Sequence, residues 1–356
     1  MEGQRNLLIY GSTGYTGRLV VDEAIRRGLR PLLAGRDIDK VGRQAAKAGL
    51  EWRAFRLSDT RALERALADT GLVLLLAGPY KYTCARVVEA CLRTGAHYLD
   101  INGELDIYEW LAGCDREARL REVMLVTGLG FDVAPSDCLA VYLKRRLPTA
   151  DELRLAFAWK GKMNMSHGTL KSGLVELSHG IRVRHKGRLV PSSMNAKSLV
   201  IDFGWGPVSC DLISWGDLVT AYYSTGIPDI ETYTPIRFSQ QRQMAMLTWV
   251  QRALSWSAVR SLAGAMINLF SNGLTAAERA QVSAVIWGQV RDPSGWRAAA
   301  QMYTPESYTL TSMSAVLAVQ MVLRGEVKHG FQTPAMAFGE DFIFEVEGVK
   351  REDLEV

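Results

Sequence analysis

The sequence predicts an α/β protein in which a doubly wound parallel sheet is followed by a second, α+β domain with a mixed, mostly antiparallel sheet. Two observations predict this fold class. Between residues 6 and 127, short aliphatic runs alternate with amphipathic segments whose apolar residues recur at helical spacing. After residue 130 this alternation stops, and longer strand-like segments follow, with hairpin-like turns among them.

The aliphatic runs of the first region are the expected strands of the parallel sheet. The segments between them carry glycine near several of their ends, which is typical of helix C-termini. A repeating order of strand, helix and strand predicts parallel strands covered by helices on both faces. The expected strands are LLIY, RPLLAG, WRAFRL, GLVLLLAG, HYLDI and VMLVTG.

The second region begins with a predicted helix, PSDCLAVYLKRRL, which has Pro135 in its first turn. Hairpin-like turns are expected at Lys186–Gly187 and at residues 293–295. Two helices are expected at 167–178 and 243–269, and an apolar helix that packs on a sheet at 307–325. The expected strands are ELRLAFAWKG, IRVRHKGRLVP, KSLVIDFGWGPVSCD, VSAVIWGQVRD and GWRAAAQMYTP.

Composition argues against several classes of protein. The formal net charge is +4, and the basic residues are scattered, so we expect no nucleic-acid partner. The five cysteines form no C-x-x-C pair, which argues against a disulfide framework or a zinc site and fits a reducing cytoplasm. We expect no signal peptide and no metal. We also expect no transmembrane segment, because the uncharged runs fall short of the about 20 apolar residues that a spanning helix needs.

A glycine-rich turn joins the first strand to the first helix. It reads Gly11-Ser-Thr-Gly14-Tyr-Thr-Gly17. Glycine permits a tight turn and a close approach of backbone to a pyrophosphate, and the helix N-terminus offers N–H groups and a positive dipole end. In this setting the turn predicts dinucleotide binding by a Rossmann domain. Its spacing is G-x-x-G-x-x-G, one residue longer before the middle glycine than the usual motif.

The residues after the second strand indicate which dinucleotide binds. Many NAD sites have an acidic residue here, whereas this chain has Arg36 followed by Asp37. A guanidinium matches a 2′-phosphate with a forked, charged contact, so we expect NADP(H). Two alternatives stay open: Arg36 and Asp37 belong to a surface turn and a helix cap, or Asp37 binds a ribose and NAD is the cofactor.

In a doubly wound sheet the ligand lies along the carboxyl ends of the strands. This rule extends the predicted cofactor site from the glycine loop to the loops after the other strands. An ordinary strand end is the alternative for each residue taken alone. The predicted cofactor-binding residues are Gly11, Ser12, Thr13, Gly14, Tyr15, Thr16, Gly17, Arg36, Asp37, Ser58, Asp59, Ala77, Gly78, Pro79, Tyr80, Asn102, Gly103 and Phe131.

The chain resembles the saccharopine dehydrogenase-like oxidoreductases, especially the branch that contains the trans-acting enoyl reductases. The resemblance implies a Rossmann domain completed by C-terminal elements, a substrate domain built around a mixed sheet, NADP(H) as cofactor and a homodimer. It implies no particular substrate. The motifs that carry it are GSTGYTGRLV, AGRD, AGPY, YLDINGE, GFDVAPSD, SHGTLKSGLVEL, DPSGW, SYTLTSMSAVLA and GFQTPAMAFG.

We expect three parts in the chain. Residues 1–133 are the Rossmann dinucleotide-binding domain, and residues 134–305 are an α+β domain for substrate binding and dimerisation. Residues 306–356 are a C-terminal helix and tail that return to the Rossmann domain.

Candidate catalytic residues come from the expected cleft. No tyrosine has lysine four residues later, so the Tyr-x-x-x-Lys mechanism of short-chain dehydrogenases is excluded. Tyr80 is a candidate proton donor, and Glu104 and Asp132 are candidates to carry a proton or order a water. The alternatives are a Tyr80 ring that packs on the ribose, and capping or domain-joining hydrogen bonds for the two acids.

The substrate side is predicted from the second domain. By analogy with the family, the helix start at Ser166, Gly168 and Thr169 faces the nicotinamide and binds substrate; His167 is a helix cap or an acid. An amino-acid imine would need an arginine clamp, yet Arg182 and Arg184 alternate with apolar residues as in an exposed strand with its polar side chains outward.

The segment 244–270 has large aromatic side chains among arginines. It fits a helix on a membrane surface, a helix that lines a lipid-sized pocket, or one packed on the second sheet or at a dimer interface. We therefore expect an NADP(H)-dependent reductase of the C=C (enoyl) or C=O bond of an apolar small molecule of lipid or polyketide origin. A saccharopine-like imine reductase and a non-catalytic NADP(H)-binding sensor or scaffold remain the alternatives.

Overall fold

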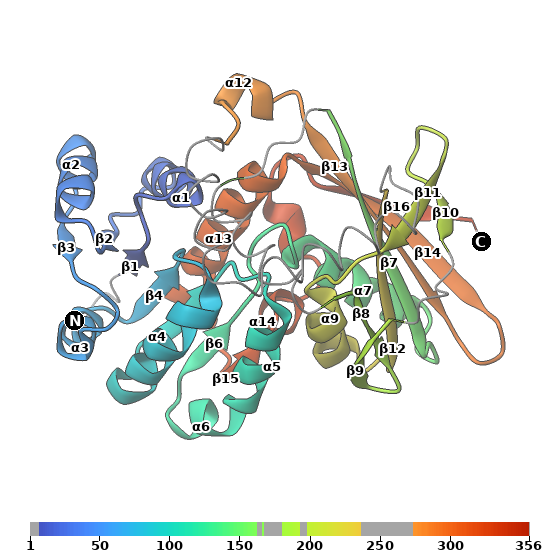
Figure 1. The fold of residues 1–356 in the computed structure, drawn as a ribbon, viewed down its shortest axis with the longest axis horizontal. Coiled ribbons are helices and arrows are strands. Elements are labelled where there is room, and N and C mark those ends of the chain that lie inside the picture. Colours follow the sequence, from blue (N-terminus) through green and yellow to red (C-terminus); the bar gives the residue numbers. More distant parts are fainter. Residues whose placement is uncertain (1–6, 162–165, 167–179, 193–197, 236–272, 356) are drawn as a thin grey trace. The chain divides into compact units, whose positions relative to one another are not determined.

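The computed structural model of the chain describes residues 7–161, 166, 180–192, 198–235 and 273–355. The chain divides into two compact units (Figure 1). The first contains residues 1–134 and 307–346, and the second contains residues 135–306 and 347–356. No helix among the described residues is both long enough and apolar enough to cross a membrane.

The first unit contains a parallel sheet that has seven strands in the described residues. The strands run in the order β15-β6-β5-β4-β1-β2-β3. The six predicted strands are confirmed, and the seventh comes from the C-terminal part of the chain. Their bounds are β1 Leu7–Tyr10, β2 Leu32–Gly35, β3 Trp52–Ala54, β4 Leu72–Leu75, β5 His97–Asp100, β6 Met124–Val126 and β15 Gly330–Gln332.

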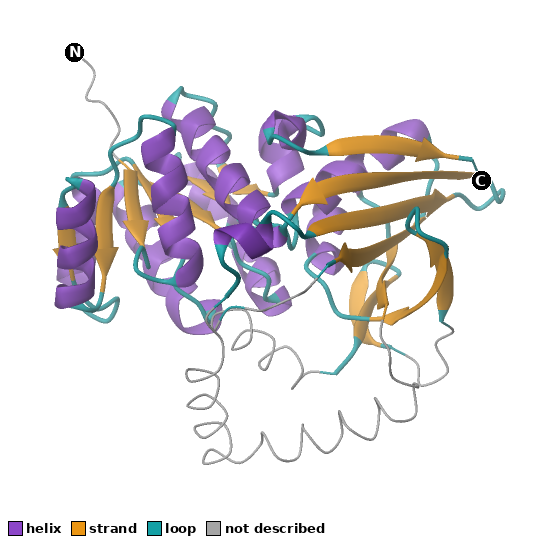
Figure 2. Ribbon diagram, turned by 90° about the horizontal axis from the view of Figure 1, so that it is seen from above, coloured by secondary structure: helices purple, strands orange, loops and turns teal. Residues whose placement is uncertain are grey.

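Helices cover both faces of this sheet (Figure 2). Helix α13 packs beside α1, and α3 packs beside α4 on the opposite face (Figure 1). A sheet covered on both faces explains why its strands are almost wholly apolar. The helices are α1 Tyr15–Arg26, α2 Ile38–Ala48, α3 Thr60–Ala68, α4 Tyr80–Thr94, α5 Leu105–Gly113, α6 Asp115–Leu120, α13 Ser307–Leu323, α14 Pro334–Phe338 and the 3-10 helix η1 Phe342–Glu345.

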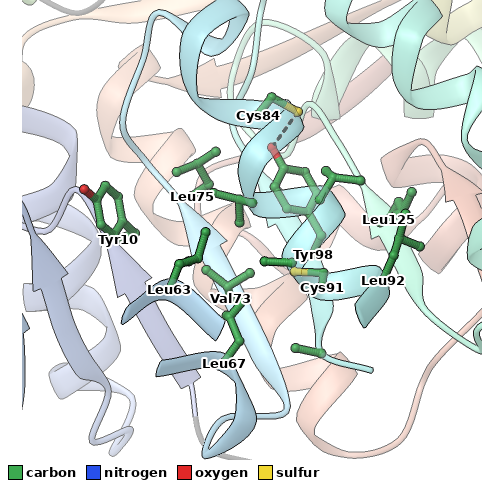
Figure 3. Close-up of a cluster of buried hydrophobic side chains, with 14 of the residues drawn as sticks. Tyr10, Leu63, Leu67, Val73, Leu75, Cys84, Cys91, Leu92, Tyr98 and Leu125 are labelled. Atoms are coloured by element: carbon green, nitrogen blue, oxygen red, sulfur yellow. Dashed lines mark hydrogen bonds between the residues drawn. The ribbon is translucent and has the colours of Figure 1, made fainter. Parts of the chain in front are cut away.

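The core between the sheet and α4 contains two polar side chains in contact. The hydroxyl of Tyr98 hydrogen bonds with Cys84 Sγ at 3.2 Å, among buried leucines and valines (Figure 3). Burial raises the pKa of the Cys84 thiol and of the Tyr98 hydroxyl well above their usual values. Both groups are therefore neutral parts of the core rather than reactive side chains.

The second unit contains a mixed sheet that is mostly antiparallel. Strands β7 and β12 form its parallel pair. The predicted hairpin at Lys186–Gly187 joins β8 and β9, and the turn at residues 293–295 joins β13 and β14. The strands are β7 Glu152–Lys160, β8 Arg182–His185, β9 Arg188–Pro191, β10 Leu199–Asp202, β11 Pro207–Leu212, β12 Asp229–Pro235, β13 Ser283–Arg291, β14 Arg297–Pro305 and β16 Lys350–Leu354; the helices are α7 Ala134–Arg146, α9 Asp217–Thr225 and α12 Ala276–Arg279.

The C-terminal tail differs from the sequence-based expectation. Residues 306–356 were expected to return to the Rossmann domain. Residues 307–346 do belong to the first unit, but β16, within residues 347–356, forms antiparallel pairs with β14 and so belongs to the second sheet. The segment alternates charged and apolar residues too weakly to predict which sheet it joins. The predicted helices at 167–178 and 243–269 lie outside the described residues.

Arg184 corrects another expectation. It was predicted on an outward-facing side of β8, but its side chain is 4% exposed. Its guanidinium donates to the carbonyl oxygens of Leu218 and Gly187 and lies 4.3 Å from the ring centroid of Tyr222. The alternation correctly predicted a strand but not that α9 covers this face of it.

We predict that Arg184→Met destabilises the second unit by about 2–4 kcal/mol, because it leaves two carbonyl oxygens without their charged donor. Arg188→Met in the neighbouring strand is the matched control, since Arg188 is exposed and the substitution should change stability by less than about 0.5 kcal/mol. Urea unfolding of both variants measures the difference. Equal stabilities would contradict this role of Arg184.

Candidate cofactor site

The candidate site lies in the first unit, at the carboxyl ends of the parallel strands. The strand order 3-2-1-4-5-6 places the direction change of the sheet between β1 and β4. In doubly wound α/β proteins, the loops at such a direction change leave a crevice that binds nucleotides, so we place the candidate site here. The glycine loop follows β1, and the segment Ala77–Pro79 follows β4.

Packing within the protein explains why two of the three loop positions require glycine. Gly11 has a φ of 93°, and a Cβ there would lie 2.9 Å from the backbone carbon of Leu76. A Cβ on Gly17 would lie 2.2 Å from the carbonyl oxygen of Gly11. These glycines let the loop pack against β4 and let α1 pack against the loop.

Packing within the protein does not require glycine at position 14. The backbone of Gly14 is extended, with φ −66° and ψ 170°, and a Cβ there would meet only the Gly11 carbonyl oxygen, at 3.4 Å. The residue is exposed, and it is the N-cap of α1, with no side chain that caps the helix and no acid in its first turn. A bare surface before uncapped N–H groups fits the pyrophosphate of a dinucleotide.

The residues after β2 divide between two roles. Asp37 is the N-cap of α2: its carboxylate accepts from the backbone N–H of Lys40 at 3.0 Å and lies 3.3 Å from the Lys40 ammonium. Arg36 is exposed and donates no hydrogen bond to another described residue. The guanidinium is thus the group that can meet a ligand, while Asp37 has the helix-cap role.

The other predicted contact residues lie at the ends of β3 and β4. Asp59 caps α3, because its carboxylate accepts from the N–H of Ala62 at 3.0 Å, and Ser58 beside it is exposed. The carbonyl of Ala77 accepts from the Thr83 hydroxyl at 2.7 Å, and Gly78 is exposed. Whether these residues contact a cofactor stays a prediction.

A buried carboxylate connects the loops after β5 and β6, and the sequence analysis did not select it. Asp100 is fully buried and accepts from the N–H groups of Asn102 and Gly128 and from the hydroxyls of Thr127 and Tyr98, at 2.7–3.0 Å. Burial raises the pKa of Asp100, and these hydrogen bonds oppose that rise. An acid as the last residue of an apolar strand was the signal that could have indicated it.

The connection continues to β4 through two residues of the predicted site. The side-chain oxygen of Asn102 accepts from the N–H of Glu104 at 2.8 Å. The Glu104 carboxylate accepts from the N–H groups of Tyr80 and Lys81, at 2.8 and 2.9 Å, and so caps the start of α4. Glu104 therefore has the capping role that was the alternative to a catalytic one.

Tyr80 is placed differently from its predicted role. Its side chain is 6% exposed, and its hydroxyl donates to the carbonyl oxygen of Leu75 at 3.2 Å. Burial raises the pKa of this hydroxyl well above its usual value. A hydroxyl that points into the core of its own domain is poorly placed to protonate a substrate, so this geometry argues against the proton-donor role, which stays a prediction.

Asp132 is the predicted acid that the structure leaves open. It follows β6, is partly buried and makes no hydrogen bond with another described residue. Burial raises the pKa of its carboxyl to about 6. A Cβ on Gly103 would lie 2.8 Å from Asp132 Oδ2, so glycine at position 103 makes room for this carboxyl. Asp132 can therefore change its protonation near neutral pH.

The remaining predicted residues have mixed outcomes. Phe131 is buried, and its N–H donates to the Thr311 hydroxyl of α13 at 2.9 Å, so the loop after β6 is held by the C-terminal helix. Ser166 is buried, and its substrate role stays a prediction. Gly168 and Thr169 lie outside the described residues. No group of metal-binding side chains occurs among the described residues.

Comparisons with known proteins bear on the fold and on the first unit. Residues 7–126 match the family described as the saccharopine dehydrogenase NADP binding domain. This part of the chain is therefore similar to the NADP-binding domains of that family. The whole fold is similar to that of a saccharopine dehydrogenase (L-Glu forming) from Saccharomyces cerevisiae, with a TM-score of 0.67 at 15% identity over 99% of this chain and 100% of that one.

Curated relatives match a smaller part. A saccharopine dehydrogenase-like oxidoreductase of Homo sapiens is 26% identical over 162 residues, which is 40% of this chain and 38% of that protein. A trans-acting enoyl reductase of Mycobacterium bovis is 30% identical over 159 residues, or 41% of this chain and 37% of that protein. The chain spans half or less of the length of such relatives.

We predict different effects for alanine at two glycines of the glycine loop. Gly14→Ala should weaken dinucleotide binding about tenfold or more with little change in stability, because the new methyl group makes only an ordinary contact with the Gly11 carbonyl oxygen and otherwise meets the ligand. Gly17→Ala should cost about 1–3 kcal/mol of stability, because its methyl group overlaps backbone. Calorimetry and urea unfolding measure the two effects; an equal loss of stability in both would contradict this division.

We predict that Asp132→Asn stabilises the domain at neutral and higher pH. The pKa of the Asp132 carboxyl in the folded protein is about 6, above its usual 3.8. The free energy of unfolding therefore falls as the pH rises between these two values. The gain for the variant should reach up to about 3 kcal/mol above pH 6 and vanish below about pH 4. Urea unfolding across this range tests it, and a gain that does not depend on pH would exclude the titration of Asp132.

Proposed function

We propose that this chain is an NADP(H)-dependent oxidoreductase that reduces a C=C or C=O bond of an apolar small molecule. The observation that carries the proposal is the ligand surface of the first unit: bare backbone at Gly14, the uncapped N-terminus of α1, and the exposed guanidinium of Arg36. The similarity to NADP-binding domains of oxidoreductases supports the reaction class.

The residues of the chain divide the work as follows. The α1 N-terminus holds the pyrophosphate, and Arg36 favours NADP(H) by binding its 2′-phosphate. The bound nicotinamide supplies the hydride. Reduction also needs one proton, and Asp132 is the group on the carboxyl edge whose pKa of about 6 lets it hold a proton near neutral pH. It would release that proton to the carbon or oxygen that becomes an anion after hydride addition.

Two alternatives are weighed by particular residues. A saccharopine-like imine reductase needs an arginine clamp, but the Arg184 guanidinium already donates to two backbone carbonyls. A sensor without turnover does not need an open acid beside the cofactor edge, whereas Asp132 is such an acid. The relative named as an enoyl reductase favours conjugated substrates. A homodimer and a cytoplasmic location remain our predictions.

The test is NADPH oxidation with a panel of apolar enones, ketones and amino-acid imines. We expect turnover with an enone or ketone, falling as pH rises through about 6, and an about 10²–10⁴-fold lower rate for Asp132→Asn. Turnover with imines alone would favour the imine reductase. Tight NADPH binding without turnover of any member would favour the sensor.

A further inference from the structure

Helix α2 carries a basic face next to the predicted 2′-phosphate position. Lys40, Arg43 and Lys47 are spaced three and four residues apart, so they share one side of the helix. All three side chains are exposed. Basic residues are common on the exposed face of a surface helix. Only a position close to the glycine loop would indicate that these residues bind a ligand.

Two contacts fix that position. Gln44 Nε2 donates to the carbonyl oxygen of Ser12 in the glycine loop at 3.0 Å, which turns the side of α2 that carries residues 40 and 44 toward the loop. A ring carbon of Trp52 lies 3.2 Å from where a Cβ on Gly42 would be, so the side that carries Gly42 faces β3. Lys40 therefore lies on the flank of the glycine loop, with Arg43 between this flank and solvent.

Asp37 contacts Lys40, the first residue of the basic face, at the start of the helix. Its carboxylate binds both the backbone N–H and the ammonium of Lys40, directly after Arg36. The hydrogen bond from the Lys40 N–H is the main cause that lowers the pKa of Asp37, and the charges of Lys40 and Arg43 add to it. The Cα–Cβ bond of a helical residue is tilted toward the helix N-terminus, so Arg43 leans toward the start of α2, which Arg36 and Asp37 precede.

Neither Arg36 nor Arg43 donates a hydrogen bond to another described residue, so both guanidinium groups can turn to an incoming ligand. Asp39, in the first turn, is the other acid on this part of the helix. The three cations at positions 36, 40 and 43 therefore exceed the acids at positions 37 and 39. A phosphate monoester, with a charge of about −1.5 to −2 near pH 7, matches this excess.

We propose that Lys40 and Arg43 complete, together with Arg36, a three-cation site for the 2′-phosphate of NADP(H). The proposal rests on the proposed function, because it requires a dinucleotide along the carboxyl edge of the sheet. Lys40 contributes from the glycine-loop side, Arg36 from the end of β2 and Arg43 from the solvent side. The affinity difference between NADPH and NADH is then shared among three residues.

The experiment compares Lys40→Gln, Arg43→Gln and the double variant by calorimetric titration with NADPH and with NADH. Each single variant should weaken NADPH binding about 3–30-fold and leave NADH binding within about twofold. The double variant should lose at least about tenfold of the preference. Lys47→Gln is the matched control, because its side chain starts about 10 Å farther along the same face and should change nothing.

The same group of variants also shows whether a loss of binding comes from misfolding. Lys40→Gln keeps the backbone N–H that Asp37 accepts, and the charge-conserving K40R and R43K should retain most of the preference. A double variant whose NADPH-to-NADH preference stays within about twofold of the unmodified chain overturns the three-cation site alone. If the unmodified chain binds neither dinucleotide, the proposed function fails as well.

Discussion

Burial of the Asp100 carboxylate at the end of β5 constrains the candidate site more than any other contact. A charge taken out of water needs hydrogen bonds, and Asp100 collects them from the loops that follow β5 and β6. Asn102 and Glu104 extend the same connection to the start of α4, after β4. Three neighbouring strand ends are thereby held in one arrangement, which a rigid bound ligand requires.

The glycine loop shows a second kind of constraint, in which the available space rather than charge determines which residues the loop can contain. Gly11 and Gly17 are needed by the protein's own packing, whereas Gly14 is needed only if something else approaches it. The Asp100 connection and this loop flank the direction change of the sheet from opposite sides. Asp132, in the loop after β6, lies beside the Asp100 connection, where Gly103 makes room for its carboxyl. Fixed surroundings and one titratable group are what an acid–base site consists of.

Much of the fold could be predicted from the sequence, because periodicity and turn residues are local signals. The strands of the first sheet and the Lys186–Gly187 hairpin are examples. The partners of side chains are not local, so the sequence alone did not determine them. It left open the capping of α4 by Glu104, did not indicate that the Tyr80 hydroxyl turns into the core, and wrongly predicted an outward-facing Arg184, which α9 covers. The sequence did not indicate Asp100 because two of its four donors, Thr127 and Gly128, lie 27 and 28 residues away.

The segment order has a consequence for biosynthesis. The first unit is assembled from residues 1–134 and 307–346, with the second unit between them in the chain. While the ribosome is still making the intervening residues, β6 is an open sheet edge, since β15 has not yet emerged. The nascent protein therefore carries this open sheet edge through most of its translation, and both sheets are complete only after residues 330–354, which contain β15 and β16, have been made.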